Sequence, residues 1–198
     1  MKTVVLATNN THKAQEIEAA LNMPGWEFKT LRQIGIVSDP VEDADEFVGN
    51  ARIKALAAHE ASGGLAALAD DSGIAVDALG GRPGVYSARY AGEPCDDEAN
   101  NDKLLAELGD LPWEQRTAHY ACALVFIDED GSEIVAEGTV EGFIGYERHG
   151  QGGFGYDPLF YPAEYDGKLT FAEVSQDQKA LISHRGRALQ NLAKKIVP

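Results

Sequence analysis

The chain alternates between apolar and polar segments, and the spacing of its apolar side chains predicts both strands and helices. Residues 2–7 are typical of a short buried strand, and residues 10–21 carry apolar side chains at helical spacing. Residues 26–31 alternate weakly, residues 38–46 form an acidic loop, and residues 47–61 have helical spacing again. The first third therefore predicts the order strand, helix, strand, loop, helix.

The middle of the chain favours strands around one helix. Residues 65–69 form an apolar run that predicts a central strand, and residues 73–79 predict a neighbouring strand. A helix is expected over residues 96–108. Its N-cap is expected at Asp96 or Asp97, because a short side chain with a free oxygen accepts from the first backbone N–H groups of a helix.

The last third predicts a hairpin and a closing helix. Residues 117–128 and 133–145 are strand-like, and the Glu129-Asp130-Gly131 turn between them is typical of a β-hairpin. Residues 178–196 predict one helix that Gly186 interrupts. The mixture indicates an α/β protein built around a mixed β-sheet.

Composition and charge narrow the function classes. The 198 residues include 17 Lys and Arg against 32 Asp and Glu, a formal net charge of −15. This charge argues against binding to a nucleic-acid polymer or to an anionic membrane. No apolar run approaches the roughly 18 residues of a membrane helix, and the apolar start is too short for a signal peptide. We expect a cytoplasmic protein in which Cys95 and Cys122 are free thiols; the alternative is a disulfide between them.

The segment Thr8-Asn9-Asn10-Thr11-His12-Lys13 stands where the first predicted strand meets the first predicted helix. Backbone N–H groups and the positive end of the helix dipole gather at such a junction, and both suit a phosphate. Lys13 adds a positive charge one turn into the helix. The alternative from these residues alone is an ordinary N-cap beside an exposed lysine.

The Asp70-Asp71-Ser72 segment follows a predicted buried strand, where open α/β sheets bind their ligands. Neighbouring side chains of an extended segment point to opposite sides, so we expect one carboxylate to face the site and the other to be structural. Carboxylates and substrate phosphates together hold Mg²⁺, and the acidic loop could contribute Glu42. The alternatives are a polar turn and a solvated run of acids.

Two later segments add aromatic and basic side chains. Residues 152–158 form a Gly-rich loop whose aromatic rings could stack on a nucleobase and whose Asp157 could accept hydrogen bonds from the base edge. The same rings could instead pack into the core. Lys179 and the Ser183-His184-Arg185-Gly186 segment are basic, and their alternative is a solvated helix surface.

Six segments, in this order, resemble the inosine triphosphate pyrophosphatase family, the noncanonical purine NTP pyrophosphatases. They span residues 8–186 and are Thr8-x-Asn10-x-x-Lys13, Phe47-x-x-Asn50-Ala51-x-x-Lys54-Ala55, Ala69-Asp70-Asp71-Ser72-Gly73, Pro83-Gly84-Val85-Tyr86-Ser87-Ala88-Arg89-Tyr90, residues 152–158, and Ser183-His184-Arg185-Gly186. Each segment alone is a weak signal, whereas the ordered set is specific.

The resemblance implies an α/β fold with an elongated mixed β-sheet flanked by helices, in two lobes with a central cleft for the substrate. One domain would span residues 1–198, with a hairpin region at roughly residues 116–146 in the second lobe. The implied activity is Mg²⁺-dependent hydrolysis of ITP, dITP and XTP to the monophosphate and pyrophosphate, which removes deaminated purines from the nucleotide pool. A homodimer is also implied.

The resemblance also implies roles for individual residues. Asp71 would be the catalytic proton acceptor and, with Glu42, a Mg²⁺ ligand. The implied substrate-binding residues are Thr8, Asn9, Asn10, Thr11, His12 and Lys13 for the triphosphate, Lys54 and Ser72 beside it, Phe154, Gly155, Tyr156 and Asp157 for the base pocket, and Lys179, His184 and Arg185 for its closing wall. A donor to the 6-oxo group would favour hypoxanthine or xanthine over adenine.

Two positions depart from the family pattern. Asn9 stands where many relatives have Gly, which is a mild change because Asn tolerates left-handed geometry. Gly49 stands where many relatives have Glu, which removes one acid. This loss motivates an alternative, a non-catalytic purine nucleotide sensor. Another Mg²⁺-dependent phosphatase ranks last, because its Asp-x-Asp motif after the first strand is absent. The role of Asp70 stays open.

Charge is unevenly distributed along the chain. Residues 179–198 carry five basic groups and no acid, whereas residues 39–46 and residues 93–102 carry five acids each and no base. We therefore expect the net charge to describe the outer surface. The predicted site would be locally cationic, through Lys13, Lys54, Lys179, Arg185 and Mg²⁺.

Overall fold

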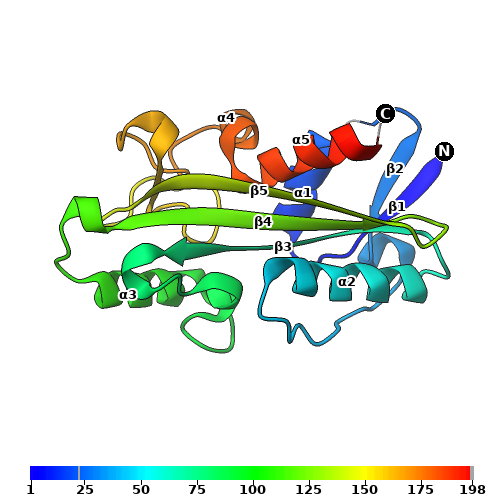
Figure 1. Ribbon diagram of the computed structural model, residues 1–198, viewed down its shortest axis with the longest axis horizontal. Helices are drawn as coiled ribbons and strands as arrows, with labels where there is room; N and C mark the ends of the chain where they lie inside the picture. The colour runs from blue at the N-terminus through cyan, green and yellow to red at the C-terminus, as the bar shows by residue number, and fades with distance from the viewer. Residues whose placement is uncertain (22, 197–198) are drawn as a thin grey trace. The chain divides into compact units, whose positions relative to one another are not determined.

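The computed structural model describes residues 1–21 and 23–196 and has a mixed α/β fold (Figure 1). Its strands are β1 (Lys2–Leu6), β2 (Trp26–Thr30), β3 (Ala66–Val76), β4 (Thr117–Ile127), β5 (Glu133–Ile144) and β6 (Phe160–Pro162). Its α-helices are α1 (Thr11–Ala20), α2 (Phe47–Ala61), α3 (Asp97–Leu108), α4 (Gln176–Ile182) and α5 (His184–Ile196). The predicted mixed sheet flanked by helices is confirmed.

The six strands form one sheet in the order β2-β1-β3-β4-β5-β6. β1 pairs in parallel with both β2 and β3, whereas β6 pairs antiparallel with β5. The chain divides into two compact units: residues 1–71, 122–138 and 185–198 form the first, and residues 72–121 and 139–184 form the second. The turn end of the β4–β5 hairpin, residues 122–138, thus belongs to the first unit, and the start of β4 and the end of β5 belong to the second.

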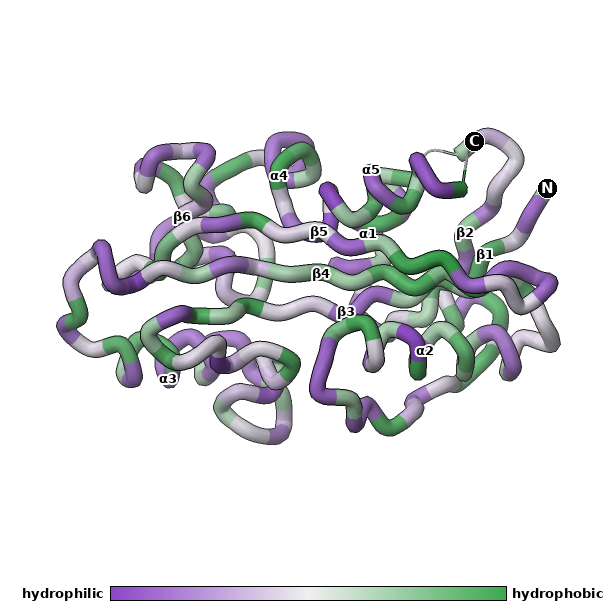
Figure 2. Tube along the Cα trace, viewed as in Figure 1, coloured by the Kyte–Doolittle hydropathy of each residue, from purple (hydrophilic) through white to green (hydrophobic). Residues whose placement is uncertain are grey.

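The first unit has a helix layer on each face of its strands, because successive strand side chains point to opposite faces. Val4 and Leu6 of β1 pack with α1 and α5, whereas Val5 packs with α2. The face of α2 toward the strands is built from Ala51, Ala55 and Ala58, which are small enough to let the helix lie close. Hydrophobic residues accordingly follow the strands of this unit in Figure 2.

The second unit has its own core, formed by side chains from β3, β4, β5, α3 and the segment after β5. Tyr120 of β4 meets the rings of Phe160 and Phe171 at centroid distances of 4.8 and 6.2 Å. Arg116 is fully buried and donates to the carbonyl oxygens of Ile144 and Gly145. This core supports the Gly-rich loop that precedes β6.

The structure corrects two of the predicted elements. Residues 65–69 and 73–79 are not two strands, because β3 runs unbroken from Ala66 to Val76. Asp70 and Asp71 lie inside this strand, since both carboxylates find basic or amide partners there. The closing helix is two helices, and they part at Ser183, whose backbone is extended (φ −66°, ψ 157°), rather than at Gly186.

Other predicted features are confirmed. The second helix has the predicted bounds, and Asp96 is the N-cap of α3, accepting from the backbone N–H groups of Glu98 and Ala99. Cys95 and Cys122 are both free thiols, the first exposed and the second buried. Among the described residues, no helix combines the length and apolar character needed to span a membrane.

Candidate active site

The turn from β1 into α1 is organised by its own side chains. Asn10 is the N-cap of α1, and its Oδ1 accepts from the backbone N–H groups of His12 and Lys13 at 2.9 and 3.2 Å. The Thr8 hydroxyl oxygen accepts from the Asn10 backbone N–H at 3.1 Å. Asn9, Asn10, Thr11 and His12 are exposed. The turn therefore presents polar groups to solvent in a fixed arrangement.

Asp70 is the buried anion behind this turn. Its side chain is fully buried, and its Oδ2 lies 3.1 Å from Lys13 Nζ and 3.0 Å from Arg185 Nη2. Arg185 also pairs with Glu16 of α1. Burial alone would raise the pKa of Asp70, but the charges of Lys13 and Arg185 hold that pKa well below its usual range. Asp70 is therefore ionised and ties the start of α1 to the start of α5.

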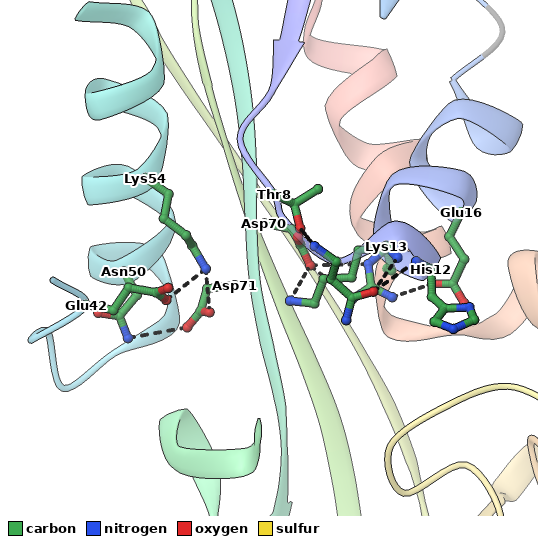
Figure 3. A network of polar contacts seen from close by, with 11 residues as sticks. Thr8, His12, Lys13, Glu16, Glu42, Asn50, Lys54, Asp70 and Asp71 are labelled. Atoms are coloured by element: carbon green, nitrogen blue, oxygen red, sulfur yellow. Dashed lines mark hydrogen bonds and ion pairs between the residues drawn. The ribbon is translucent and has the colours of Figure 1, made fainter. Parts of the chain in front are cut away.

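Asp71 turns to the other face of β3 and meets α2. Its Oδ1 accepts from Lys54 Nζ at 2.9 Å, and its Oδ2 accepts from Asn50 Nδ2 at 3.4 Å. Lys54 Nζ also lies 2.9 Å from Glu42 Oε2. Figure 3 shows Asp70 and Asp71 pointing to opposite sides of the strand. The expectation that the two carboxylates diverge is thereby confirmed.

Burial and neighbouring charges shift the pKa values of both Asp71 and Lys54. Desolvation raises the pKa of the Asp71 carboxyl above its usual value, although the neighbouring Lys54 charge opposes the shift. For Lys54, burial would lower the pKa, but the carboxylates of Asp71 and Asp70 raise it overall. Lys54 therefore stays protonated, and Asp71 is a stronger proton acceptor than a solvated aspartate.

Glu42 and Asp71 fit a divalent cation. Their oxygens converge on a single cationic group, Lys54 Nζ, and both lie 2.9 Å from it. Mg²⁺ is held in proteins by one or two carboxylates together with water and substrate phosphates, so this pair is a sufficient protein contribution. Among the described residues, no cluster of three or more His, Cys, Asp or Glu side chains has the arrangement of a metal site. Substrate oxygens would therefore have to complete the coordination.

The second unit holds the Gly-rich loop and its partners. Asp157 Oδ2 accepts from the Phe154 backbone N–H at 2.9 Å and from Lys179 Nζ at 2.6 Å. The same ammonium lies 4.8 Å from the centroid of the Phe154 ring, as a cation–π contact. Gly153 has φ +73°, and a Cβ there would overlap the Asp157 carboxylate. The loop thus folds around the Asp157–Lys179 pair.

The remaining predicted residues of this unit differ in exposure. Tyr156 is buried, and its hydroxyl donates to the Ser87 carbonyl at 2.8 Å, so its side chain belongs to the core. The His184 ring stacks on Tyr120 with a centroid distance of 4.6 Å and an interplanar angle of 7°. Ser72 is half-buried in β3, directly after Asp71. The Gly155 carbonyl oxygen accepts a hydrogen bond from Asn101 Nδ2.

Two side chains of the first unit contact candidate residues although the sequence predicts no role for them. Asn50 and Glu16 contact the candidate residues directly, and each lies on the same helix face as a predicted lysine, four residues before Lys54 and three after Lys13. That helical spacing was the signal in the sequence that could have indicated them.

A cavity of about 270 Å³ lies beside the start of α1. It is lined by ten residues, namely Thr8, Asn9, Asn10, Thr11, Ala14, Gln15, Glu18, Thr30, Arg32 and Gln33.

The expectation of a locally cationic site needs correction. Lys13 and Arg185 face Asp70, Lys54 faces Glu42 and Asp71, and Lys179 faces Asp157, each within ion-pair distance. The charges are compensated because a buried cation is costly unless it is paired. The protein side chains alone therefore supply no excess of positive charge here.

A mixed α/β fold, two carboxylates that converge on one ammonium group and a helix that starts with exposed polar side chains are together typical of proteins that bind phosphates and metal ions. The sequence profile of the Ham1 family matches residues 4–195. The chain therefore belongs to the Ham1 family, and the assignment made from the six ordered segments is confirmed.

Named relatives and solved structures agree with this assignment. The chain is 50% identical over 187 residues to the dITP/XTP pyrophosphatase of Desulforamulus reducens, covering 94% of this chain and 92% of that protein. It is 45% identical over 194 residues to the dITP/XTP pyrophosphatase of Bacillus subtilis, covering 98% and 96%. The Ham1 protein of Staphylococcus aureus superimposes with a TM-score of 0.86 at 38% identity, over 98% of each chain. That of Coxiella burnetii gives 0.88 at 37%, over 99% and 98%.

Proposed function

We propose that this protein hydrolyses noncanonical purine nucleoside triphosphates (dITP, XTP and ITP) to the monophosphate and pyrophosphate, with Mg²⁺ as cofactor. The observation that carries the proposal is the convergence of Glu42 and Asp71 on one cationic group, Lys54 Nζ. The names of the relatives support the substrate class.

The triphosphate end is assigned to the first unit. Lys13 and Lys54 are half-buried ammonium groups that a phosphate could contact after exchanging one carboxylate partner. The Thr8 hydroxyl can rotate to donate, because its hydrogen is not fixed by the contact in which its oxygen accepts. These groups bind and orient the chain of phosphates so that one phosphorus atom faces Asp71.

Asp71 is assigned the role of binding and activating the attacking water molecule. Its carboxylate is held by two donors and has a raised pKa, so it can orient a water molecule and take its proton. Mg²⁺, when held by Glu42 and Asp71, would neutralise phosphate charge and favour departure of pyrophosphate.

The purine end is assigned to four residues of the second unit, Phe154, Asp157, Lys179 and His184. Phe154 is half-buried and offers a ring face, while the Asp157–Lys179 pair offers both an acceptor and a donor. A donor from His184 would match the 6-oxo group of hypoxanthine, whereas adenine presents an amino group there.

The substrate panel tests the proposal most directly. Purified protein with Mg²⁺ is given dITP, XTP, dATP and dGTP, and pyrophosphate and orthophosphate are measured separately. We expect pyrophosphate from dITP and XTP, much slower turnover of dATP and dGTP, and loss of turnover in Asp71→Asn with little change in thermal stability. Equal turnover of all four, or release of orthophosphate, contradicts the proposal.

The sensor alternative gains no support from Gly49. A Cβ at this position would lie 2.6 Å from the Ala44 Cβ, so the glycine permits close packing of the acidic loop on α2. Glu42 and Asp71 converge on Lys54 Nζ without a third acid. Tight dITP binding with no turnover at any Mg²⁺ or Mn²⁺ concentration would favour the sensor instead.

We also propose that the whole chain acts as one functional domain and assembles as a cytoplasmic homodimer, as its resemblance to the pyrophosphatases implies. Light scattering on the purified protein tests the assembly. Twice the mass of one chain supports the dimer, and the mass of a single chain at micromolar concentration contradicts it.

A further inference from the structure

Asn50 is a buried amide that none of the predicted roles uses. It lies in the first turn of α2 and is only 2% exposed. Its Oδ1 accepts from the Ala44 backbone N–H at 3.0 Å, and its Nδ2 faces Asp71 Oδ2 at 3.4 Å. A backbone N–H can only donate and a carboxylate accepts, so these two partners fix the orientation of the amide.

The amide joins two segments that each carry one candidate metal ligand. Ala44 stands two residues after Glu42 in the acidic loop, and Asp71 lies in β3. Asn50 and Lys54 are four residues apart on one face of α2 and donate to different oxygens of Asp71. The rotation of the Asp71 carboxylate is therefore set from α2, together with the place of the loop that carries Glu42 (Figure 3).

Gly49 supports the same arrangement from the neighbouring position. An added Cβ would lie 2.6 Å from the Ala44 Cβ, closer than two side-chain carbons can approach. The absence of a side chain lets the loop lie against α2 at the distance that the Ala44 hydrogen bond requires.

We propose that Asn50 is a positioning residue that sets Glu42 and Asp71 in the mutual geometry needed to capture a divalent cation. This inference rests on the proposed function for its consequence in turnover. Its direct consequence is in metal binding, which is measured without turnover. Outer groups that orient metal ligands typically change metal affinity by about 10–100-fold when they are removed.

Asn100 provides a matched control. It occupies the fourth position of α3 as Asn50 does in α2, it is also 2% exposed, and it also joins a helix to a loop. Its Oδ1 accepts from the Ala91 backbone N–H at 2.7 Å, and its Nδ2 donates to the Ala88 carbonyl at 2.9 Å. Neither partner is a carboxylate. Asn100→Ala therefore measures the structural cost of losing such an amide.

The experiment measures Mn²⁺ binding to the metal-free protein by electron paramagnetic resonance, for wild type, Asn50→Ala, Gly49→Ala and Asn100→Ala. We expect the Mn²⁺ dissociation constant to rise by about tenfold or more in Asn50→Ala and to stay within about twofold of wild type in Asn100→Ala. Gly49→Ala should weaken Mn²⁺ binding as well, since it displaces the loop, and it keeps the test open if Asn50→Ala does not fold.

Turnover of dITP over a range of Mg²⁺ concentrations is the second measurement. We expect Asn50→Ala to need about tenfold more Mg²⁺ for half-maximal rate, with a smaller change in KM for dITP at saturating Mg²⁺. Unchanged Mn²⁺ affinity in folded Asn50→Ala, or in Gly49→Ala if Asn50→Ala does not fold, overturns the inference. Weakened Mn²⁺ binding in a protein whose wild type does not cleave dITP retains the inference and rejects the proposed function.

Discussion

Asp70 and Asp71 are adjacent residues with separate structural roles. Asp70 is wholly buried between Lys13 and Arg185, whereas Asp71 meets α2 and shares Lys54 with Glu42. Both are acids in the middle of a buried strand, which is costly unless each carboxylate is paired. Their separate partners explain why the strand tolerates them, and they suggest different consequences when each cluster is changed.

Asp70→Asn should destabilise the fold strongly. Removing one partner of a buried ion pair leaves Lys13 and Arg185 without their shared anion, and such a loss costs about 3–5 kcal/mol. Urea unfolding followed by circular dichroism measures the change. Glu133→Gln is the control, because its bidentate pair with Arg52 is on the surface and should contribute less than about 1 kcal/mol. Similar losses in both variants would show that Asp70 is not the structural anchor described.

Lys54→Gln should separate metal binding from turnover. Lys54 Nζ occupies the point on which Glu42 and Asp71 converge, so it competes with a divalent cation for both carboxylates. We expect Mn²⁺ to bind at least as tightly as in wild type. The rate of dITP cleavage should fall by about a hundredfold, as for loss of a transition-state donor. A parallel loss of Mn²⁺ affinity would show that Lys54 supports the metal site instead.

At the scale of single elements, α4 is a short helix that depends on its cap. It spans only Gln176–Ile182, and it begins with a capping box in which Ser175 accepts from the Gln178 backbone N–H while the Gln178 side chain accepts from the Ser175 backbone N–H. The helix carries Lys179, whose ammonium holds Asp157. The cap therefore supports the placement of the candidate base pocket.

Ser175→Ala should lower the free energy of unfolding by about 1 kcal/mol, the usual cost of losing an N-cap. We also expect KM for dITP to rise with little change in kcat, because Lys179 is displaced while Asp71 is not. Ser62→Ala is the control, since its hydroxyl donates to the His59 carbonyl at the end of α2. An equal change in KM for both variants would contradict the link from α4 to substrate binding.

Element identity followed from apolar spacing, and element boundaries depended on tertiary partners. The helix at residues 47–61 was predicted with its observed bounds, because Ala51, Ala55 and Ala58 mark its buried face. The unbroken β3 was not predicted, since two acids in a row are typical of a strand end. The ion pairs of Asp70 with Lys13 and Arg185 and of Asp71 with Lys54, all with partners distant in sequence, make the continuous strand possible.

The candidate site could be predicted only in part for the same reason. Residue types and their order pointed to Asp71, Glu42 and the turn from β1 into α1. Binding of Mg²⁺ requires carboxylates, and a helix start suits a phosphate, so few residue types can serve at those positions. Asn50 belongs to one of the six ordered segments, but the sequence predicts no role for it, since an asparagine near a helix start is commonly a cap. Its role depends on the carboxylate across from it and on the loop folded over it, neither of which local sequence reveals.

At the scale of the whole molecule, the excess of acids raises the question of how the protein attracts a triphosphate, which is itself an anion. The formal net charge is −15, and the basic side chains proposed for the substrate are each paired with carboxylates. In the first unit, the three cations Lys13, Lys54 and Arg185 face four acids, Glu16, Glu42, Asp70 and Asp71. A triphosphate approaching this group meets no net positive charge from the protein, so added cations must provide the attraction.

Removal of the divalent cation should therefore affect the phosphate end of the substrate alone. Equilibrium binding of a non-hydrolysable dITP analogue is measured in Mg²⁺ and in EDTA, with inosine as the ligand that lacks phosphates. We expect the analogue to bind at least about tenfold more weakly in EDTA, whereas inosine changes by less than about twofold. Equal binding of the analogue in EDTA would contradict this expectation. Lys13 and Lys54 would then exchange their carboxylate partners for phosphates without a divalent cation, so the ion pairs of the free protein would not oppose substrate binding.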